Sequence, residues 1–294
     1  MKLKNEKTIN SVVGVDVGGT KISVGLVKNE KLIKQATVPT PQNASENEVV
    51  SVIIRAIQQL NDDSLSAIGI GVPGLVNVKN GIVYDVQNIP SFTNVKLREL
   101  LEAVFHVPVY VGNDANCFVL GAKYFDKGRP FKNLVGLTLG TGLGGGVIVN
   151  DLLHEGVGSG AGEFGYIPYL DGILEHYCSG QFFQRNGYPD GLAVARLAEN
   201  GETEALSLFS EFGRHLGEAI KIAAHVLSPE AVILGGSVSN SFSLFETSMW
   251  ESIRRFPYRN VVDNLVVETV NDPHLAVKGA ASLAYQKLSV LMDS

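Results

Sequence analysis

The same succession of predicted elements occurs twice in this chain: a strand rich in Val and Ile, a glycine-rich turn and a second such strand. The first has strands predicted over residues 11–16 and 22–27 around Val17-Gly18-Gly19-Thr20. The second has apolar runs over residues 133–139 and 145–150 around a turn over residues 140–144. Because β-branched runs bounded by glycine turns are typical of hairpins, the repeat predicts two similar halves with a boundary near residue 113.

Strands and helices are predicted to alternate around both hairpins. In the first half we expect a strand over 31–38, a helix with an apolar face over 49–60, a strand over 67–72, a helix over 97–105 and a strand over 107–111. In the second half we expect a helix over 206–227, a strand over 231–234 and a terminal helix over 275–291. The pattern indicates an α/β protein.

The composition excludes several classes of protein. The 294 residues, 45% hydrophobic and 18% charged, are enough for two buried cores, and the net charge of -6 argues against a nucleic-acid partner. The first apolar run is interrupted by Asp16 without a cleavage site after it, and the most apolar window, 67–76, is too short to span a bilayer. With only Cys117 and Cys178 as thiols, we expect a soluble protein of the reducing cytoplasm, with no membrane partner.

The first glycine turn has the chemistry of a phosphate-binding hairpin. The glycines at 18 and 19 let backbone N–H groups converge on an anion, Thr20 adds a hydroxyl donor, and Asp16 can hold a hydrated Mg²⁺ beside the phosphates. The turn lacks the spacing of a Walker loop and leads into a strand. An ordinary glycine hairpin is the alternative.

The second glycine cluster contains a G-x-G-x-x-G spacing at residues 140, 142 and 145. A dinucleotide fold needs a helix directly after this spacing, whereas Val147-Ile148-Val149 predicts a strand. We therefore expect a second hairpin that closes on the same phosphates.

An acidic residue, Asp114, lies between the two hairpins, where a predicted strand meets a helix beginning at Ala115. Asp is a common N-cap residue, so this position has a purely structural interpretation. The alternative is a general base that accepts the proton of a substrate hydroxyl as it attacks a phosphoryl group.

Seven motifs occur in an order that resembles the ROK family (repressors, open reading frames and sugar kinases): GVDVGGTK, GIGVPG, GNDANC, GLTLGTGLGGG, GAGEFG, LEHYCSG and VILGGS. The resemblance spans residues 12 to about 240. It implies the actin-like ATPase (ribonuclease H-like) fold with two α/β domains flanking a cleft, a small domain over 1–113 completed by the helix 278–294 and a larger one over 114–277. It also implies ATP and Mg²⁺, phosphorylation of a hexose or N-acetylhexosamine at O6, and a homodimer.

The resemblance also assigns roles to individual residues. For the nucleotide it implies the first phosphate motif Asp16, Gly18, Gly19, Thr20 and Lys21, the second phosphate motif Gly140, Thr141 and Gly142, and the adenosine motif Gly235 and Gly236, with Asp16 holding Mg²⁺ through water. For the sugar it implies the catalytic base Asp114 and the ligands Pro73, Gly74, Asn113, Glu163, Tyr166 and Glu175. Ionised carboxylates only accept hydrogen bonds, which suits the hydroxyl groups of a neutral sugar.

The chain departs from the family pattern in two places. Tyr166 occupies the position of the histidine that touches the sugar, and the segment from Tyr166 to Ile173 lacks the cysteine-rich zinc loop. Cys178 and His176 are close in sequence but do not complete a tetrahedral zinc site, so we expect a buried thiol, a surface imidazole and no structural zinc.

Two other functions fit parts of the pattern. A sugar-responsive transcriptional regulator or non-catalytic sensor of the family would carry an added N-terminal helix-turn-helix domain, for which about ten residues before the first strand leave no room. An actin-like assembly ATPase fits the hairpins but does not require Glu163 and Glu175 beside an Asp114 base. We therefore expect an ATP-dependent sugar kinase.

Overall fold

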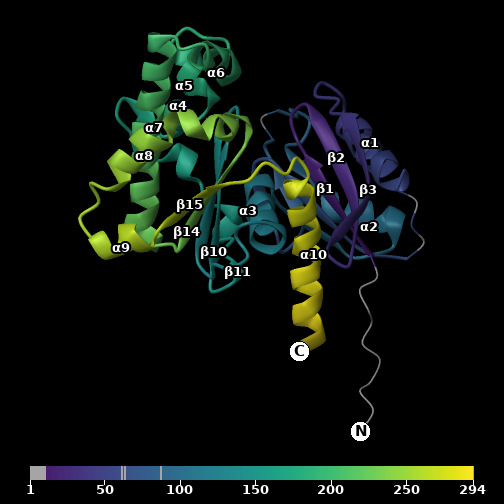
Figure 1. The fold of residues 1–294 in the computed structure, drawn as a ribbon. Coiled ribbons are helices and arrows are strands. Elements are labelled where there is room, and N and C mark those ends of the chain that lie inside the picture. The colour runs from purple at the N-terminus through teal and green to yellow at the C-terminus, as the bar shows by residue number, and fades with distance from the viewer. Residues whose placement is uncertain (1–10, 61, 63, 87, 294) are drawn as a thin grey trace. The chain divides into compact units, whose positions relative to one another are not determined.

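The computed structural model describes residues 11–60, 62, 64–86 and 88–293, and the chain divides into two units (Figure 1). Of the described residues, the first unit contains those from Ser11 to Phe125, the segment Gly156–Gly160 and those from His274 to Asp293. The second unit contains Asp126–Glu155 and Ala161–Pro273. None of the described helices is both long enough and apolar enough to cross a membrane.

A five-stranded mixed sheet in the order β3-β2-β1-β4-β8 forms the centre of the first unit. Its strands are β1 (Ser11–Val17), β2 (Lys21–Lys28), β3 (Lys31–Pro39), β4 (Leu65–Val72) and β8 (Val109–Asn113). The first three form antiparallel pairs, whereas β4 runs parallel to β1 and β8 runs parallel to β4. The strands predicted for this half are confirmed, with ends displaced by one or two residues.

The α-helices that the structure describes in the first unit are α1 (Glu46–Gln58), α2 (Leu97–Phe105), α3 (Asp114–Phe125) and α10 (Leu275–Asp293). The predicted apolar face of α1 is buried, with Val49, Ile53 and Ile57 in the core. Although α10 ends the chain, it packs against α3 and β1 (Figure 1). The unit therefore continues to Phe125, whereas the sequence places the boundary at residue 113, before α3.

A small three-stranded sheet that the sequence analysis did not predict lies between β4 and α2 in the chain. It consists of β5 (Leu75–Asn77), β6 (Ile82–Tyr84) and β7 (Asn94–Val95). Arg98 ties this sheet to the main one, because its guanidinium donates to the carbonyl oxygens of Val78, Lys79 and Val109 at 2.7–2.8 Å. The 3₁₀ helix η1 (Val157–Ser159) contacts β5, and the Ser159 hydroxyl donates to the carbonyl of Val76 at 3.3 Å.

The second unit repeats the strand order of the first. Its main sheet has the order β11-β10-β9-β14-β15, in which β9 and β10 form the antiparallel hairpin and β14 and β15 run parallel to β9. The strands are β9 (Leu134–Leu139), β10 (Leu143–Val149), β11 (Leu152–Leu153), β14 (Ala231–Gly235) and β15 (Val266–Thr269). The predicted repeat of two halves is confirmed, but β10 begins at Leu143, so the turn is shorter than predicted.

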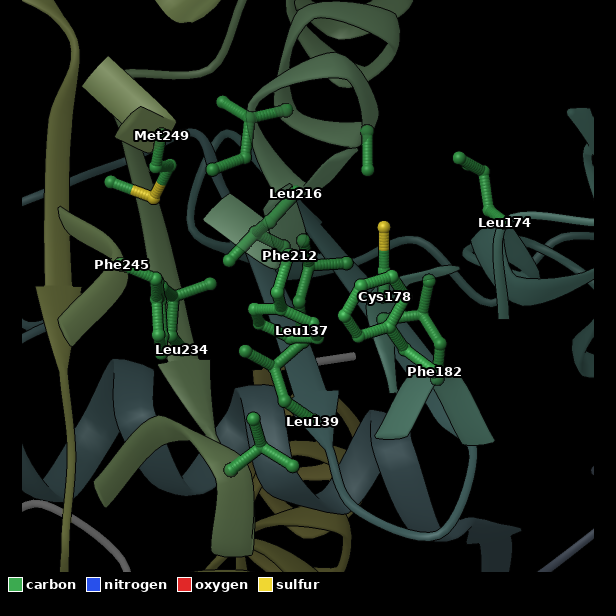
Figure 2. Packing of buried hydrophobic residues seen from close by; sticks show 14 of the residues in the cluster. Leu137, Leu139, Leu174, Cys178, Phe182, Phe212, Leu216, Leu234, Phe245 and Met249 are labelled. Atoms are coloured by element: carbon green, nitrogen blue, oxygen red, sulfur yellow. The ribbon is translucent and has the colours of Figure 1, made fainter. Parts of the chain in front are cut away.

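Helices cover the second sheet and supply most of its core (Figure 2). The α-helices are α4 (Glu175–Cys178), α5 (Gly180–Arg185), α6 (Gly191–Glu199), α7 (Thr203–Leu227), α8 (Phe242–Ile253) and α9 (Arg259–Asn264). The shorter elements are the 3₁₀ helices η2 (Phe164–Tyr166) and η3 (Ser237–Ser241) and the hairpin of β12 (Pro168–Tyr169) and β13 (Gly172–Ile173). The long helix α7 was predicted, and its Phe209, Phe212 and Leu216 are fully buried.

Candidate functional site

The carboxyl ends of three parallel strands meet at one edge of the first sheet. The register pairs Asp16 near the end of β1 with Gly71 of β4, and it pairs the last residue of β4 with the last residue of β8. Pro73 and Gly74 directly follow β4, and Asp114 directly follows β8. Ligands of α/β sheets bind outside the carboxyl ends of parallel strands, so this edge is the candidate site of the first unit.

Ionisation of the two aspartates at this edge is disfavoured. Burial raises the pKa of Asp16 to about 7, the charge of Asp114 adds to this shift, and Lys21 opposes it. Burial also raises the pKa of Asp114, against a hydrogen bond of 2.8 Å that its carboxylate accepts from the N–H of Ala115. Beside them, burial and both carboxylates raise the pKa of the Cys117 thiol. Carboxylates in such surroundings favour a nearby cation.

The residue that caps α3 is Asn113. Its side-chain oxygen accepts the N–H groups of Ala115 at 2.9 Å and Asn116 at 3.2 Å, and its amide nitrogen donates to the Gly74 carbonyl at 3.2 Å. One side chain therefore closes the helix end and holds the loop after β4. Asn113 bonds both N–H groups, so the cap does not require Asp114, although one carboxylate oxygen of Asp114 also accepts the Ala115 N–H.

The loop after β3 braces the first glycine hairpin. Thr40 donates through its hydroxyl to the Gly18 carbonyl at 2.7 Å and through its N–H to the Thr20 carbonyl at 3.0 Å. Gln42 donates through its amide to the Gly19 carbonyl. The Gly18 N–H donates to the Lys21 carbonyl at 2.9 Å and closes the turn. An anion would therefore meet the N–H groups further along the turn and the exposed Thr20 hydroxyl.

The second glycine hairpin lies at the corresponding edge of the second sheet. The N–H of Gly140 donates to the Gly142 carbonyl at 3.0 Å, and Thr141 at the tip is exposed. The register pairs Gly235 of β14 with Thr138 of β9, so the two glycines at 235 and 236 lie beside the strand that leads into the hairpin. The structure therefore brings together the second phosphate motif and the adenosine motif.

The predicted sugar ligands of the second unit lie close to this hairpin. A Cβ on Gly162 would lie 2.6 Å from the carbonyl oxygen of Gly145, so the loop that carries Glu163 can lie against β10 only with glycine there, where φ is +96°. After this loop comes Tyr166, whose exposed fraction is 59%. A Cβ on Gly165 would approach both the Leu143 carbonyl and the side chain of Glu175, which places both glutamate segments at the start of β10.

The carboxylate of Glu175 already has partners within the second unit. One oxygen accepts the N–H of Leu143 at 2.9 Å, and the other accepts the side-chain amide of Gln181 at 2.7 Å. Each carboxylate oxygen accepts two hydrogen bonds, so capacity remains for sugar hydroxyls. The sequence predicts Glu175 as a sugar ligand, whereas its bond to the hairpin is visible only in the structure.

The family model of the ROK family matches residues 12–287. The chain belongs to the ROK family. The match covers both hairpins, both glutamates and Asp114, and the topology of the two sheets is that of the actin-like ATPase fold shared by ROK sugar kinases.

Similar ROK proteins include kinases for two sugars. The chain is 32% identical to a glucokinase of Streptomyces coelicolor, over 92% of this chain and 96% of that protein. It is 31% identical to an N-acetyl-D-glucosamine kinase of Photobacterium profundum, over 93% and 99%. A crystal structure of a ROK family glucokinase from Streptomyces griseus in complex with glucose and AMPPNP has a TM-score of 0.78 and 29% identity, over 94% of this chain and 100% of that one.

Within this ROK protein, the predicted site residues form two groups. The first unit brings together Asp16, the first hairpin, the loop after β4, Asn113 and Asp114, and the second unit brings together the second hairpin, the two glutamates, Tyr166 and the pair at 235 and 236. Their roles as ligands stay predictions. Sequence reasoning missed the supporting residues Thr40, Gln42, Ser179 and Gln181; of these, only Ser179 belongs to a motif that was singled out.

No zinc-type cluster is formed by the residues the structure describes: none of their His, Cys, Asp and Glu side chains gather in threes or more around a common point. Cys178 is free and buried, as predicted. His176 is partly exposed, and its Nδ1 lies 3.2 Å from Nη1 of the exposed side chain of Arg185. The absence of structural zinc stays a prediction.

Proposed function

We propose that this protein transfers the γ-phosphoryl group of ATP to O6 of a hexose or N-acetylhexosamine, with Asp114 as the general base. It is an ATP-dependent sugar kinase of the ROK family. The observation that carries the proposal is the position of Asp114, directly after a parallel strand at the sheet edge that also carries Asp16 and the first glycine hairpin.

In the first unit, Asp114 accepts the proton of the sugar hydroxyl as that hydroxyl attacks the phosphoryl group. Burial favours its protonated form, which makes it a stronger base than an exposed carboxylate. Asn113 and the loop at Pro73 and Gly74 hold the sugar, and the hairpin of Gly18, Gly19, Thr20 and Lys21 binds phosphate oxygens through N–H, hydroxyl and ammonium groups.

In the second unit, the Gly140 N–H closes the hairpin on the Gly142 carbonyl. The N–H groups of Thr141 and Gly142 and the Thr141 hydroxyl bind phosphate, and Gly235 and Gly236 let the adenosine approach the backbone. Glu163 and Glu175 accept hydrogen bonds from sugar hydroxyls, and Tyr166 donates or accepts one more through its phenol.

Mg²⁺ fits the first unit. Magnesium retains several waters and is held by one or two carboxylates together with substrate phosphates, so a cluster of three protein ligands is not required. Asp16 would hold the ion, and a divalent charge there would favour the ionised form of a carboxylate whose pKa is raised to about 7. When bound, the ion supplies charge neutralisation on the phosphates. We further propose that the protein acts in the cytoplasm, since its two cysteines are free and buried. A homodimer is proposed from the family resemblance alone.

Sugar-dependent release of ADP tests the proposed function. We expect ADP release with at least one of glucose, mannose, fructose, allose, N-acetylglucosamine and N-acetylmannosamine, and almost none without sugar. The 6-deoxy form of the best substrate should bind as a competitive inhibitor and remain unphosphorylated. Release of ADP that no sugar stimulates, or sedimentation of filaments on addition of ATP, would reject the kinase; phosphorylation of the 6-deoxy sugar would reject O6.

Selective removal of metal ions distinguishes a role of Mg²⁺ from a role of Zn²⁺ in this protein. A zinc-selective chelator should leave the melting temperature and the sugar KM unchanged, because no structural zinc contributes folding free energy. EDTA in excess over Mg²⁺ should abolish turnover, and added Mg²⁺ should restore it. Stoichiometric zinc in the purified protein, lost together with activity on chelation, would contradict the prediction that the segment between Gly165 and Leu174 contributes no zinc site.

A further inference from the structure

The short corner between α4 and α5 contacts the second glycine hairpin along its length. The Gly180 N–H donates to the Gly140 carbonyl at 2.7 Å. The Ser179 hydroxyl lies 3.2 Å from the Thr141 carbonyl oxygen, and Glu175 accepts the N–H of the residue that ends the turn. The hairpin is therefore bonded at Gly140 and Thr141 by the corner and at Leu143 by the first residue of α4.

Ser179 is the centre of this corner. It is fully buried, its hydroxyl accepts the N–H of Gln181 at 3.2 Å as the cap of α5, and it lies 2.7 Å from the Glu175 carbonyl. The hydroxyl has one proton, for which the carbonyl oxygens of Glu175 and Thr141 compete. Ser179 thus joins the end of α4, the start of α5 and the tip of the hairpin.

The contact between corner and hairpin leaves no spare room. A Cβ on Gly180 would lie 3.0 Å from the Gly140 carbonyl oxygen, closer than ordinary van der Waals contact, and a Cβ on Gly142 would lie 2.4 Å from the Glu175 carboxylate. A single added methyl group at residue 180 must therefore displace the hairpin or the corner.

The corner is held from behind by the core of the second unit. Leu174, Cys178 and Phe182 recur every four residues and belong to the buried cluster that includes Phe212 and Leu216 of α7 (Figure 2). The polar groups at 175 and 179 lie one residue further along and bond to the hairpin. Because the apolar side is fixed in a close-packed core, the corner is a firm support for the hairpin.

We propose that Ser179 and Gly180 are positioning residues for the nucleotide: they hold the Gly140–Gly142 hairpin in the conformation that binds phosphate. The proposal rests on the proposed function of that hairpin. Neither residue needs to touch ATP, because each acts on a backbone carbonyl of the hairpin and so orients the N–H groups of the same turn. Their loss should weaken nucleotide use specifically.

Two variants test this role by steady-state kinetics and thermal unfolding. Ser179→Ala removes the hydroxyl, and Gly180→Ala adds the methyl group while supplying a better helix former in the first turn of α5. Both should raise the KM for ATP by about threefold to tenfold, the range expected for a lost or misaligned hydrogen bond, with the sugar KM within about twofold of its original value. Gly180→Ala keeps the test valid if Ser179→Ala unfolds.

A matched control removes a helix cap elsewhere in the same unit. Asp190 caps α6 by accepting the N–H of Ala193 at 2.8 Å, and Asp190→Ala should lower the melting temperature without changing the KM for ATP. If Asp190→Ala raised the KM for ATP as much as the corner variants do, the effect would come from a general loss of stability in the second unit. That result would overturn the proposal.

Thr141→Val serves as the reference for the hairpin itself and should raise the KM for ATP. If it does not, the proposed function of the hairpin fails, and this inference fails with it. If Thr141→Val raises the KM for ATP while both corner variants leave it unchanged, only the positioning role is overturned.

Discussion

Replacing Asp114 with Asn is expected to lower kcat by about 10²- to 10⁴-fold, the loss associated with removal of a general base. The amide keeps the oxygen that accepts the Ala115 N–H, and Asn113 still caps α3, so the fold should persist. The KM for ATP should change little, because phosphate binding is assigned to the hairpins. Kinetics with saturating sugar and thermal unfolding of the same preparation measure both effects.

The control for this variant is Asn113→Ala, which removes the cap of α3 and the bond to the Gly74 carbonyl. It should lower stability by about 1 kcal/mol and raise the sugar KM. If Asp114→Asn kept more than a third of the activity, or if the two variants lost stability and activity in the same proportion, Asp114 would be a structural residue and not the base.

Replacing Asp16 with Asn should stabilise the protein at pH 8 while abolishing activity. Burial raises the pKa of Asp16 from its ordinary value of 3.8 to about 7, so at pH 8 folding forces an ionised carboxylate into unfavourable surroundings. The penalty builds up as the pH rises from 3.8 to about 7 and is absent below that window. Removing it should increase the free energy of unfolding by on the order of 2 to 4 kcal/mol.

Urea unfolding without Mg²⁺ at pH 4 and pH 8 measures this effect. The stabilisation by Asp16→Asn should be near zero at pH 4 and at its maximum at pH 8. Asp263→Asn is the control, since it removes a carboxylate that is exposed on α9, and it should not stabilise the protein at pH 8. Equal stabilisation at both pH values, or destabilisation at pH 8, would contradict the assignment of a disfavoured charge to Asp16.

Much of the fold was predictable because its signals are local. The runs of Val and Ile in β1 and β9, with the glycines that follow, predict two hairpins, and the 3.6-residue period predicts α1 and α7. The sheet of β5, β6 and β7 was missed because strands of two or three residues are too short to show alternation. The unit boundary after α3 depends on packing against α10, more than 150 residues later in the chain.

The candidate site, like the fold, was predictable from the sequence only in part. The sequence alone determined which chemical groups are present, where each follows a strand, and that the pattern of hairpin and parallel strand occurs twice. The tertiary structure decided what supports them: Thr40 and Gln42 behind the first hairpin, and Ser179 and Glu175 behind the second. These partners lie 22 to 38 residues from the hairpin atoms they bond. No local periodicity encodes such pairs, because they meet only when the sheet brings its strand ends together.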